Sequence, residues 1–281
     1  ALGPVPDGEC ASVAFDGVHE FADLGDSSRF SGIGSGDFSL EMWVQPSAVG
    51  AEMTLLQLGD DSALFENEHI WLRVNASGGI EGTIRGDAGE SAQSVVTSTR
   101  LLQAGDWAHV HLQRDVGSEV RLYIDGFLED TSLDSAGVIG FTEQRRLLLG
   151  TAYDYETETR GEFFAGAIRE VRVWSRALSQ QEVVDKQYQE LIPSDESGLT
   201  AYWPLGDGEG SLVLDVVQQA YGELYDDLTL SASWSIGPDE CTPEPPIVDT
   251  GMYLETGDTG AAHTGLDSAD TDTDYPTSCV Q

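Results

Sequence analysis

Basic residues are scarce in this chain of 281 residues, which has 13 Lys and Arg against 50 Asp and Glu and a formal charge of −37. Lys186 is its only lysine. Nucleic-acid binding needs a basic face that replaces phosphate counterions, and docking on anionic lipid needs a basic patch. The composition therefore argues against nucleic acid and against an anionic membrane surface as partners.

The sequence also lacks a run of the ~18 apolar residues that a membrane-spanning helix needs. It opens at Ala1, with no charged segment followed by an apolar one. We therefore expect an exported protein, extracellular or at the cell surface, whose signal peptide has been removed; the alternative is a chain that has simply been trimmed.

Cysteine is rare, since Cys10, Cys241 and Cys279 are the only three. They are too few for a disulfide scaffold, and they lack the C-x-x-C spacing of many metal sites. Cys10 precedes the first strand-like run, at 11–15, and Cys241 follows the last, at 228–234. If the first and last strands are neighbours, we expect Cys10 and Cys241 to form a disulfide, which leaves Cys279 free or paired with another chain.

Hydrophobic residues make up 40% of the chain, which is enough for a sizeable core. Residues 11–235 form short runs of alternating apolar and polar residues, separated by Gly, Asp and Ser. Asp125-Gly126 is typical of a two-residue type I′ hairpin turn. The pattern predicts an all-β sandwich or barrel. The expected strands are 38–45, 55–58, 70–74, 80–84, 108–113, 120–125, 146–149, 166–174 and 200–205.

One segment has helical spacing instead. Ser179 and Glu182 form the S-x-x-E pattern of a capping box, in which each side chain accepts the other residue's backbone N–H. Apolar residues then recur at helical spacing up to Pro193. This predicts one short surface helix at about 179–192.

The composition changes after Cys241. Residues 242–281 hold eight acids, eight Thr and no Lys or Arg, as in a stalk, linker or disordered tail. The remaining 42 acidic against 13 basic side chains leave a charge of −29 on residues 1–241. The sequence thus predicts one domain at 1–241 and an acidic Thr/Asp/Gly-rich tail at 242–281.

Several short strings follow one another in a recognisable order. They are FDG at 15–17, FSLEMWVQP at 38–46, GDWAHV at 105–110, VRLYIDG at 120–126, LLG at 148–150, FAGAI at 164–168, VRVWSRAL at 171–178 and LTAYWPL at 199–205. Together they resemble the laminin-G-like/pentraxin-like group of concanavalin A-type jelly rolls. The resemblance implies a jelly roll of two curved antiparallel sheets. Such domains serve as lectins, adhesion modules and structural units, so function has to be argued from a site.

Catalytic patterns are weak. Asp154, Glu156 and Glu158 have the spacing of glycosidase carboxylates, but they follow Gly150 in a loop-like stretch. His109 and His111 point the same way on one strand, where two ordinary packed histidines are favoured over zinc ligands. We therefore expect a protein that is not an enzyme.

Calcium is the favoured metal hypothesis, since Ca²⁺ takes six to eight oxygen ligands. The resemblance implies a site formed by two loops at a sheet edge, which here carry Asp60 and Asp61 and then Asp154 and Glu156. The alternative is an acidic, solvated loop. Asp16 and Asp26 form a second, weaker candidate.

Glycan binding would use aromatic side chains beside polar groups. Tyr153 and Tyr155 are the candidates, and Trp71 is either a third or a core residue. The tryptophans within the family strings are expected to be packing residues: Trp43, Trp107, Trp174 and Trp203.

Two functions follow. The first is a structural or adhesive subunit that self-associates, into a homo-oligomer or an extracellular filament, when its tail adds a strand to a neighbour's sheet edge. The alternative is a calcium-dependent, lectin-like module that binds a glycan or a surface protein. The tail residues expected to make the assembly contact are Ile247, Val248, Met252, Tyr253, Leu254 and Cys279.

Overall fold

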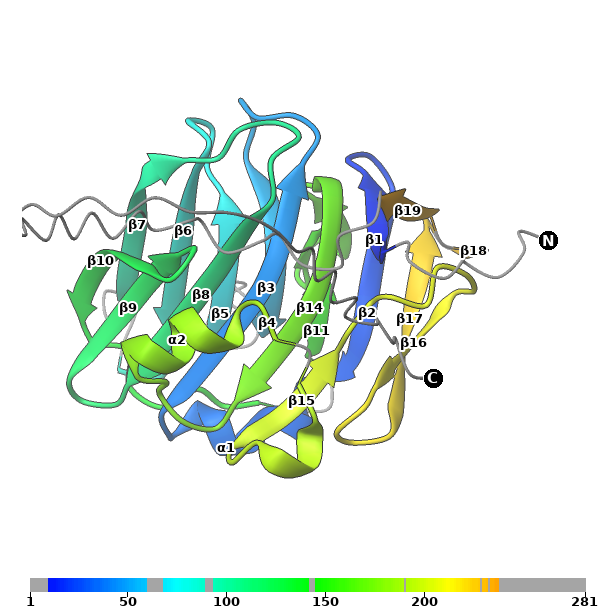
Figure 1. Ribbon diagram of the computed structural model, residues 1–281. Coiled ribbons are helices and arrows are strands. Elements are labelled where there is room, and N and C mark those ends of the chain that lie inside the picture. Colours follow the sequence, from blue (N-terminus) through cyan, green and yellow to red (C-terminus); the bar gives the residue numbers. More distant parts are fainter. Residues whose placement is uncertain are drawn as a thin grey trace, which may run out of the picture. The chain divides into compact units, whose positions relative to one another are not determined.

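The computed structural model describes residues 10–59, 68–88, 93–141, 145–189, 191–227, 229–231 and 233–237. Within them, two antiparallel sheets form a sandwich with the hydrophobic core between them (Figure 1). This confirms the predicted all-β jelly roll. The division at residue 241 stays a prediction, because residues 238–281 lie outside the described ranges.

Sheet A contains the first and last described strands. Its order is β10 (Phe127–Leu133), β9 (Glu119–Ile124), β8 (Ala108–Asp115), β3 (Phe38–Pro46), β14 (Ala165–Trp174), β1 (Cys10–Asp16) and β19 (Ser233–Gly237), and β15 (Leu199–Trp203) also pairs with β14.

Sheet B packs against sheet A. Its order is β16 (Leu212–Asp215), β17 (Ala220–Asp226), β2 (Glu20–Asp26), β11 (Arg146–Leu149), β4 (Met53–Gly59), β5 (His69–Val74), β6 (Gly79–Arg85) and β7 (Gln93–Leu101), and β18 (Thr229–Leu230) also pairs with β17.

The core follows from alternation along the strands. Leu40, Met42 and Val44 of β3 and Ile70 and Leu72 of β5 are fully buried between the sheets. Successive side chains on a strand point to opposite faces, so the residues between them lie on the outer faces of sheets A and B. Several of these outer residues are polar yet buried, and they define the two regions compared below.

Turn chemistry fixes the β9–β10 hairpin. Asp125 and Gly126 have φ angles of 50° and 78°, the left-handed pair that a type I′ turn requires. The predicted turn is therefore confirmed.

Strands β1 and β19 pair antiparallel, with Cys10 opposite Gly237. The first and last strands are thus neighbours, which is the condition set for the predicted disulfide. The bond itself stays a prediction, because Cys241 lies outside the described residues, as does Cys279.

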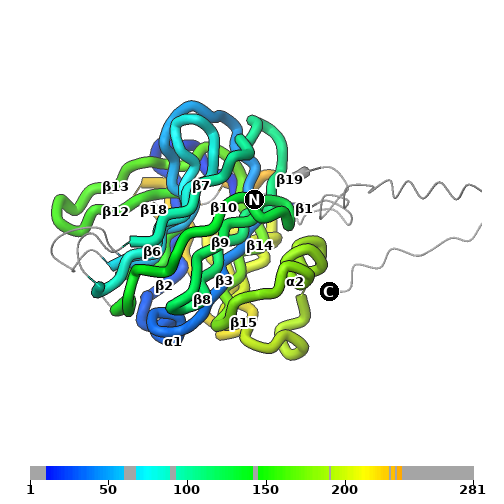
Figure 2. Tube along the Cα trace, turned by 90° about the vertical axis from the view of Figure 1, so that its left-hand side faces the viewer, coloured from blue at the N-terminus to red at the C-terminus, as the bar shows by residue number. Residues whose placement is uncertain are grey.

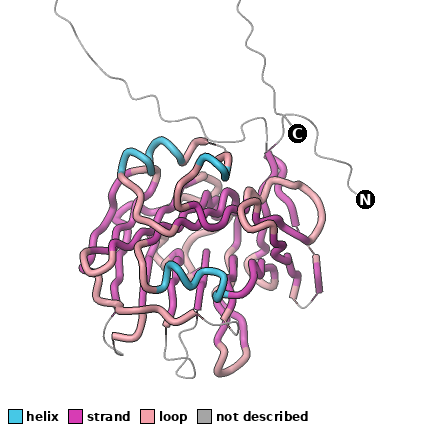
Figure 3. The backbone as a smooth tube through the Cα atoms, turned by 90° about the horizontal axis from the view of Figure 1, so that it is seen from below, coloured by secondary structure: helices cyan, strands magenta, loops and turns pink. Residues whose placement is uncertain are grey.

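In the part of the chain that the structure describes, helix is confined to short segments (Figure 3). Ser179 caps α2 (Gln180–Lys186), and the capping box with Glu182 is confirmed. The helix ends earlier than predicted because the following carbonyls are engaged by sheet A: Trp43 donates to the Gln187 carbonyl at 2.8 Å, and Arg172 to those of Lys186 and Gln189. The other segments are η1 (Ser27–Phe30), α1 (Ser31–Gly34) and η3 (Pro193–Asp195).

A small hairpin of β12 (Ala152–Asp154) and β13 (Thr159–Gly161) lies against sheet B (Figure 2). The Gln57 side chain on β4 holds it, because its amide accepts from the Tyr153 N–H at 2.6 Å and donates to the Tyr153 carbonyl at 3.1 Å. No helix in the described ranges is long and apolar enough to cross a membrane.

Candidate functional site

Three neighbouring strands of sheet B present polar side chains on its outer face. The core-facing residues of β5 are Ile70, Leu72 and Val74, so the residues between them face away from the core. Strand register then aligns the outward residues of β5, β6 and β7 in three rows: His69, Arg85 and Gln93; Trp71, Thr83 and Val95; and Arg73, Glu81 and Thr97.

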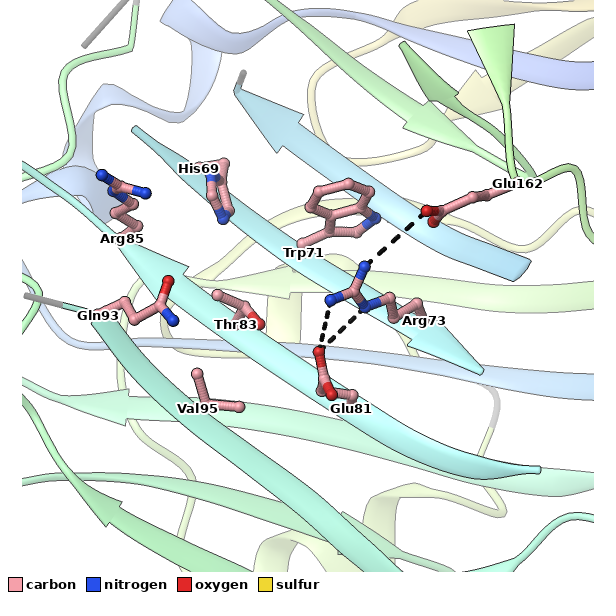
Figure 4. A pocket seen from close by; sticks show the side chains of 9 residues that line it. All are labelled: His69, Trp71, Arg73, Glu81, Thr83, Arg85, Gln93, Val95 and Glu162. Carbon is pink, nitrogen blue, oxygen red and sulfur yellow. Dashed lines mark hydrogen bonds and ion pairs between the residues drawn. The ribbon is translucent and has the colours of Figure 1, made fainter. Parts of the chain in front are cut away.

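A pocket of about 560 Å³ lies over these rows (Figure 4). All but one of its lining residues carry a side chain able to form hydrogen bonds, Val95 being the exception. The lining comprises His69, Trp71, Arg73, Glu81, Thr83, Arg85, Gln93, Val95 and Glu162.

One end of the pocket is an ion cluster. Arg73 donates to Glu81 at 2.7 and 3.0 Å, and its Nη1 lies 3.9 Å from Glu162. Burial alone would lower the pKa of Arg73, but the hydrogen bond and the negative charge of Glu81, together with Glu162, raise it. The Arg73 charge is therefore fixed and is already neutralised within the protein.

The tryptophan at the centre of the pocket is largely covered by its neighbours. Trp71 is only 9% exposed, and the Arg73 guanidinium lies 4.9 Å from its ring centre. Its indole N–H donates to the Thr54 hydroxyl at 3.0 Å. Trp71 is thus a wall of the pocket, and it offers no free ring face for a stacked sugar.

The other end carries an uncompensated charge. Arg85 is half-buried, and it makes no hydrogen bond or ion pair with any residue in the described ranges. Gln93 lies exposed beside it, and His69 stands edge-on to Trp71 at 5.7 Å. The pocket therefore has one end where two carboxylates surround a paired cation and one cationic end, visible at opposite sides of Figure 4.

The residues predicted to bind calcium are only partly described. Asp154 accepts hydrogen bonds from the Thr157 hydroxyl and from the backbone N–H groups of Thr157 and Glu156, and these bonds lower the pKa of its carboxyl. Asp60 and Asp61 lie outside the described residues. Within the residues that are described, no three His, Cys, Asp or Glu side chains are placed to hold a metal ion. Calcium at this loop stays a prediction.

The weaker calcium candidates have other partners. Asp16 accepts from the backbone N–H groups of Val18, His19 and Glu20, closing the turn after β1. Asp26 pairs with Arg146 at 2.7 Å. Each carboxylate thus has its own structural role.

The carboxylates with glycosidase-like spacing lie in the β12–β13 hairpin. Asp154 ends β12, Glu156 is in the turn, and Glu158 has a left-handed φ of 55° just before β13. They do not share one strand of either large sheet, and they do not line the pocket.

The tyrosines predicted to bind a ligand pack on the same hairpin. The rings of Tyr153 and Tyr155 meet edge-to-face at 4.6 Å, and the Tyr155 hydroxyl accepts from the Arg146 N–H at 2.8 Å. Arg160 lies over the rings of Tyr153 and Phe21, at 4.9 and 4.1 Å. Both tyrosines are half-buried, and neither lines the pocket. Their predicted role in ligand binding stays a prediction.

A second polar cluster lies on the outer face of sheet A, against α2 and the turn after it. Glu41 is fully buried, with Trp174 donating to it at 3.0 Å, Arg172 at 3.3 Å, and His109 and His111 at 3.4 and 3.3 Å. The two histidines do share one face, as predicted, and they are packed residues.

Burial and charge set the protonation of this cluster. Burial alone would raise the pKa of Glu41, but hydrogen bonds from His109 and His111 and the charge of Arg172 hold it well below its ordinary value. Burial lowers the pKa of His109 despite its contact with Glu41. Glu41 is therefore charged and His109 neutral near pH 7. Trp43, Trp174 and Trp203 are buried packing residues, as predicted, and Trp107 is half-buried.

Sequence reasoning missed most of the pocket. The available signal was the alternation of His69, Trp71 and Arg73, and then of Glu81, Thr83 and Arg85, with apolar or small residues on two strands joined by a short turn. Together, these runs predict a sheet face on which side chains able to form hydrogen bonds lie side by side. Glu162 gave no such signal, because a different part of the chain brings it to the pocket.

Comparison with known proteins identifies the class. The Concanavalin A-like lectin/glucanases superfamily matches residues 16–184, which is more than half of the chain, and the protein belongs to this superfamily. No curated protein gives a significant match.

Solved structures agree on the fold. A Bacteroides ovatus protein provisionally described as carbohydrate-binding is 20% identical with a TM-score of 0.59; the match covers 84% of this chain and 63% of that one. The heptameric SAP-like pentraxin of Limulus polyphemus is 13% identical (TM-score 0.51), with 84% and 99% covered. The CBM40 module of the Ruminococcus gnavus IT-sialidase is 16% identical (TM-score 0.50), with 62% and 96% covered. This chain thus spans less than two thirds of the Bacteroides protein.

Proposed function

We propose that the protein is an exported, lectin-like module that binds a saccharide, without catalysis, in the pocket on the outer face of sheet B. The observation that carries this proposal is the polar pocket itself, which is assembled from three strands of a rigid sheet. Its volume of about 560 Å³ lies within the usual range for small-molecule sites.

The chemistry of the lining favours a sugar. Arg73, Glu81, Glu162, Arg85 and Gln93 offer planar donors and acceptors, which suit the many hydroxyl groups of a saccharide. The similarity to proteins described as carbohydrate-binding supports the same ligand class.

The two carboxylates of the pocket favour binding over hydrolysis. Glycoside hydrolysis by paired carboxylates needs one of them to carry a proton. Glu81 accepts two hydrogen bonds from the guanidinium of Arg73, and Glu162 lies 3.9 Å from its Nη1. Both carboxylates are therefore engaged by a cation of the protein itself, which favours a role in binding.

Blocking the pocket tests the proposal. A glycan array with the full chain should give binding that Val95→Trp abolishes, because the indole would occupy the middle row of the pocket, beside Thr83. Val49→Trp is the matched control, since Val49 is 42% exposed and lies outside the pocket. Absence of binding to any glycan, or equal binding by both variants, would refute the assignment. Adding chelator to the same array tests whether binding needs calcium.

We infer a second, structural role from the tail. The edge strand β19 ends at Gly237, shortly before the apolar stretch of residues 247–254. Such a stretch could add a strand to the sheet of another copy, and the contact would propagate head to tail. Truncation before Thr242 should then leave a folded monomer by size-exclusion chromatography, whereas the full chain should form oligomers or filaments visible by electron microscopy. A full chain that is monomeric at high concentration would refute this role.

A further inference from the structure

We propose that the saccharide bound in the pocket carries a single carboxylate, which pairs with Arg85 while its hydroxyl groups face Arg73, Glu81 and Glu162. This inference rests on the proposed saccharide-binding function and adds the chemical class of the ligand.

Arg85 is unusual among the cations of this chain. Ten of the 13 cationic side chains form an ion pair with a carboxylate of the protein. Arg160 instead lies over two aromatic rings, and Arg169 lies within the charge field of Glu170. In a chain with 50 acidic residues, a partner for Arg85 would be easy to supply, yet within the described ranges it has none.

The surroundings of Arg85 suit a carboxylate. Its neighbours across the strands are His69 on β5 and Gln93 on β7, and both side chains line the same end of the pocket. A guanidinium presents a planar fork that matches the two oxygens of a carboxylate, and the Gln93 amide can add a further donor. Among the residues that the structure describes, no acidic side chain lines this end of the pocket to compete for Arg85.

The opposite end suits hydroxyl groups. Arg73 is already paired with Glu81, so the cluster of Arg73, Glu81 and Glu162 carries an excess of one negative charge. It would repel a second carboxylate and accept hydrogen bonds from hydroxyls. The two ends therefore orient an acidic sugar in one direction.

The charge of the whole chain limits the ligand to one anionic group. With a net charge of −37, the protein repels polyanions over the Debye length of about 8 Å at physiological salt. A single carboxylate in contact with Arg85 gains a charge-assisted hydrogen bond, which a long sulfated or carboxylated chain would lose to repulsion elsewhere.

Matched sugars test the inference. The probes are the methyl glycosides of galacturonate and glucuronate, each beside its uncharged methyl ester, titrated into the full chain by calorimetry. At least one acid should bind about tenfold or more tightly than its ester, since bonds to charged groups are the stronger ones. Arg85→Gln should abolish this preference. Arg121→Gln, which removes one positive charge from sheet A, should retain it.

The outcomes separate this inference from the proposed function. Equal binding of acid and ester, or binding of neutral glycans alone on the array, overturns the carboxylate and leaves the saccharide pocket standing. Tighter binding of heparin than of either uronate glycoside overturns the limit to one anionic group. Absence of binding to any glycan overturns the proposed function and this inference together. If Arg85→Gln melts at the same temperature as the unmodified protein, its loss of preference for the acid over the ester does not come from unfolding.

Discussion

The two sheets of this sandwich use polar outer faces in opposite ways. On sheet A, Glu41, His109, His111 and Arg172 are buried against α2 and the turn that follows it, and Glu41 and Arg172 bond to each other and to neighbouring groups. On sheet B, comparable side chains surround an open pocket, and Arg85 has no partner in the described part of the chain.

The difference shows how to read charges on a β-sandwich. A buried charge that has several protein partners stabilises the fold, and removing one partner exposes the others to a large desolvation cost. A charge beside a cavity and without a partner costs little to the fold and is available to a ligand. The first region is therefore structural, and the second is the candidate site.

The largest expected effect is the loss of Glu41. Glu41→Ala leaves Arg172 and two histidines buried without their shared carboxylate, so the free energy of unfolding should fall by about 3–5 kcal/mol in urea denaturation. The control is Glu81→Ala, whose partner Arg73 remains accessible to water; there we expect about 1 kcal/mol or less. Similar losses in the two variants would contradict the distinction between the faces.

The next largest effect is a loss of stability in acid, through the buried cluster of Glu41 and His109 beneath α2. The folded-state pKa values of His109 and Glu41 lie below their ordinary values of 6.5 and 4.5, so the unfolded state binds more protons as the pH falls. Stability is therefore complete above pH 6.5 and declines below it, first through His109 and then, below pH 4.5, also through Glu41. The slope should reach at most about 1.4 kcal/mol per pH unit for each group.

Denaturant melts across this pH range measure the decline. His109→Gln should flatten the portion between pH 6.5 and 4.5, whereas His19→Gln, at an exposed histidine, should not. An unchanged profile in His109→Gln would assign the decline to other groups.

A smaller effect is expected at the start of α2. The Ser179 hydroxyl accepts the Glu182 N–H, and Glu182, whose pKa is lowered to about 2 chiefly by its hydrogen bond with Arg176, accepts the Ser179 N–H in return. Ser179→Ala should therefore cost about 1 kcal/mol of stability. Ser194→Ala, an exposed serine outside a capping position, should cost much less.

The smallest effect on stability should come from the pocket itself. Arg85→Gln removes a charge that has no partner among the described residues, so the free energy of unfolding should change by about 0.5 kcal/mol or less. A loss comparable to that of Glu41→Ala would show that Arg85 has a structural role and would remove the contrast between the two faces.

Local sequence patterns predicted the framework but not the site. Alternation located the strands, Asp125-Gly126 gave the hairpin turn, and Ser179 with Glu182 gave the helix start, because each depends on residues close in sequence. The pocket depends on the register of β5, β6 and β7, which places Arg85 opposite His69. No local pattern states that register. The end of α2 was missed for the same reason, since Arg172 and Trp43 belong to distant strands.

The pairing of β1 with β19 has a mechanical consequence. Cys10 lies opposite Gly237, so a force that pulls the two ends of the described fold apart acts on the same end of an antiparallel pair. The hydrogen bonds between β1 and β19 run perpendicular to the strands, so this force would break them one after another and not all at once. A protein that bears tension through its tail would be weak at this point. A disulfide between Cys10 and Cys241 would bear the force in place of the hydrogen bonds between β1 and β19. Reducing conditions should therefore lower the force at which a single molecule begins to unfold.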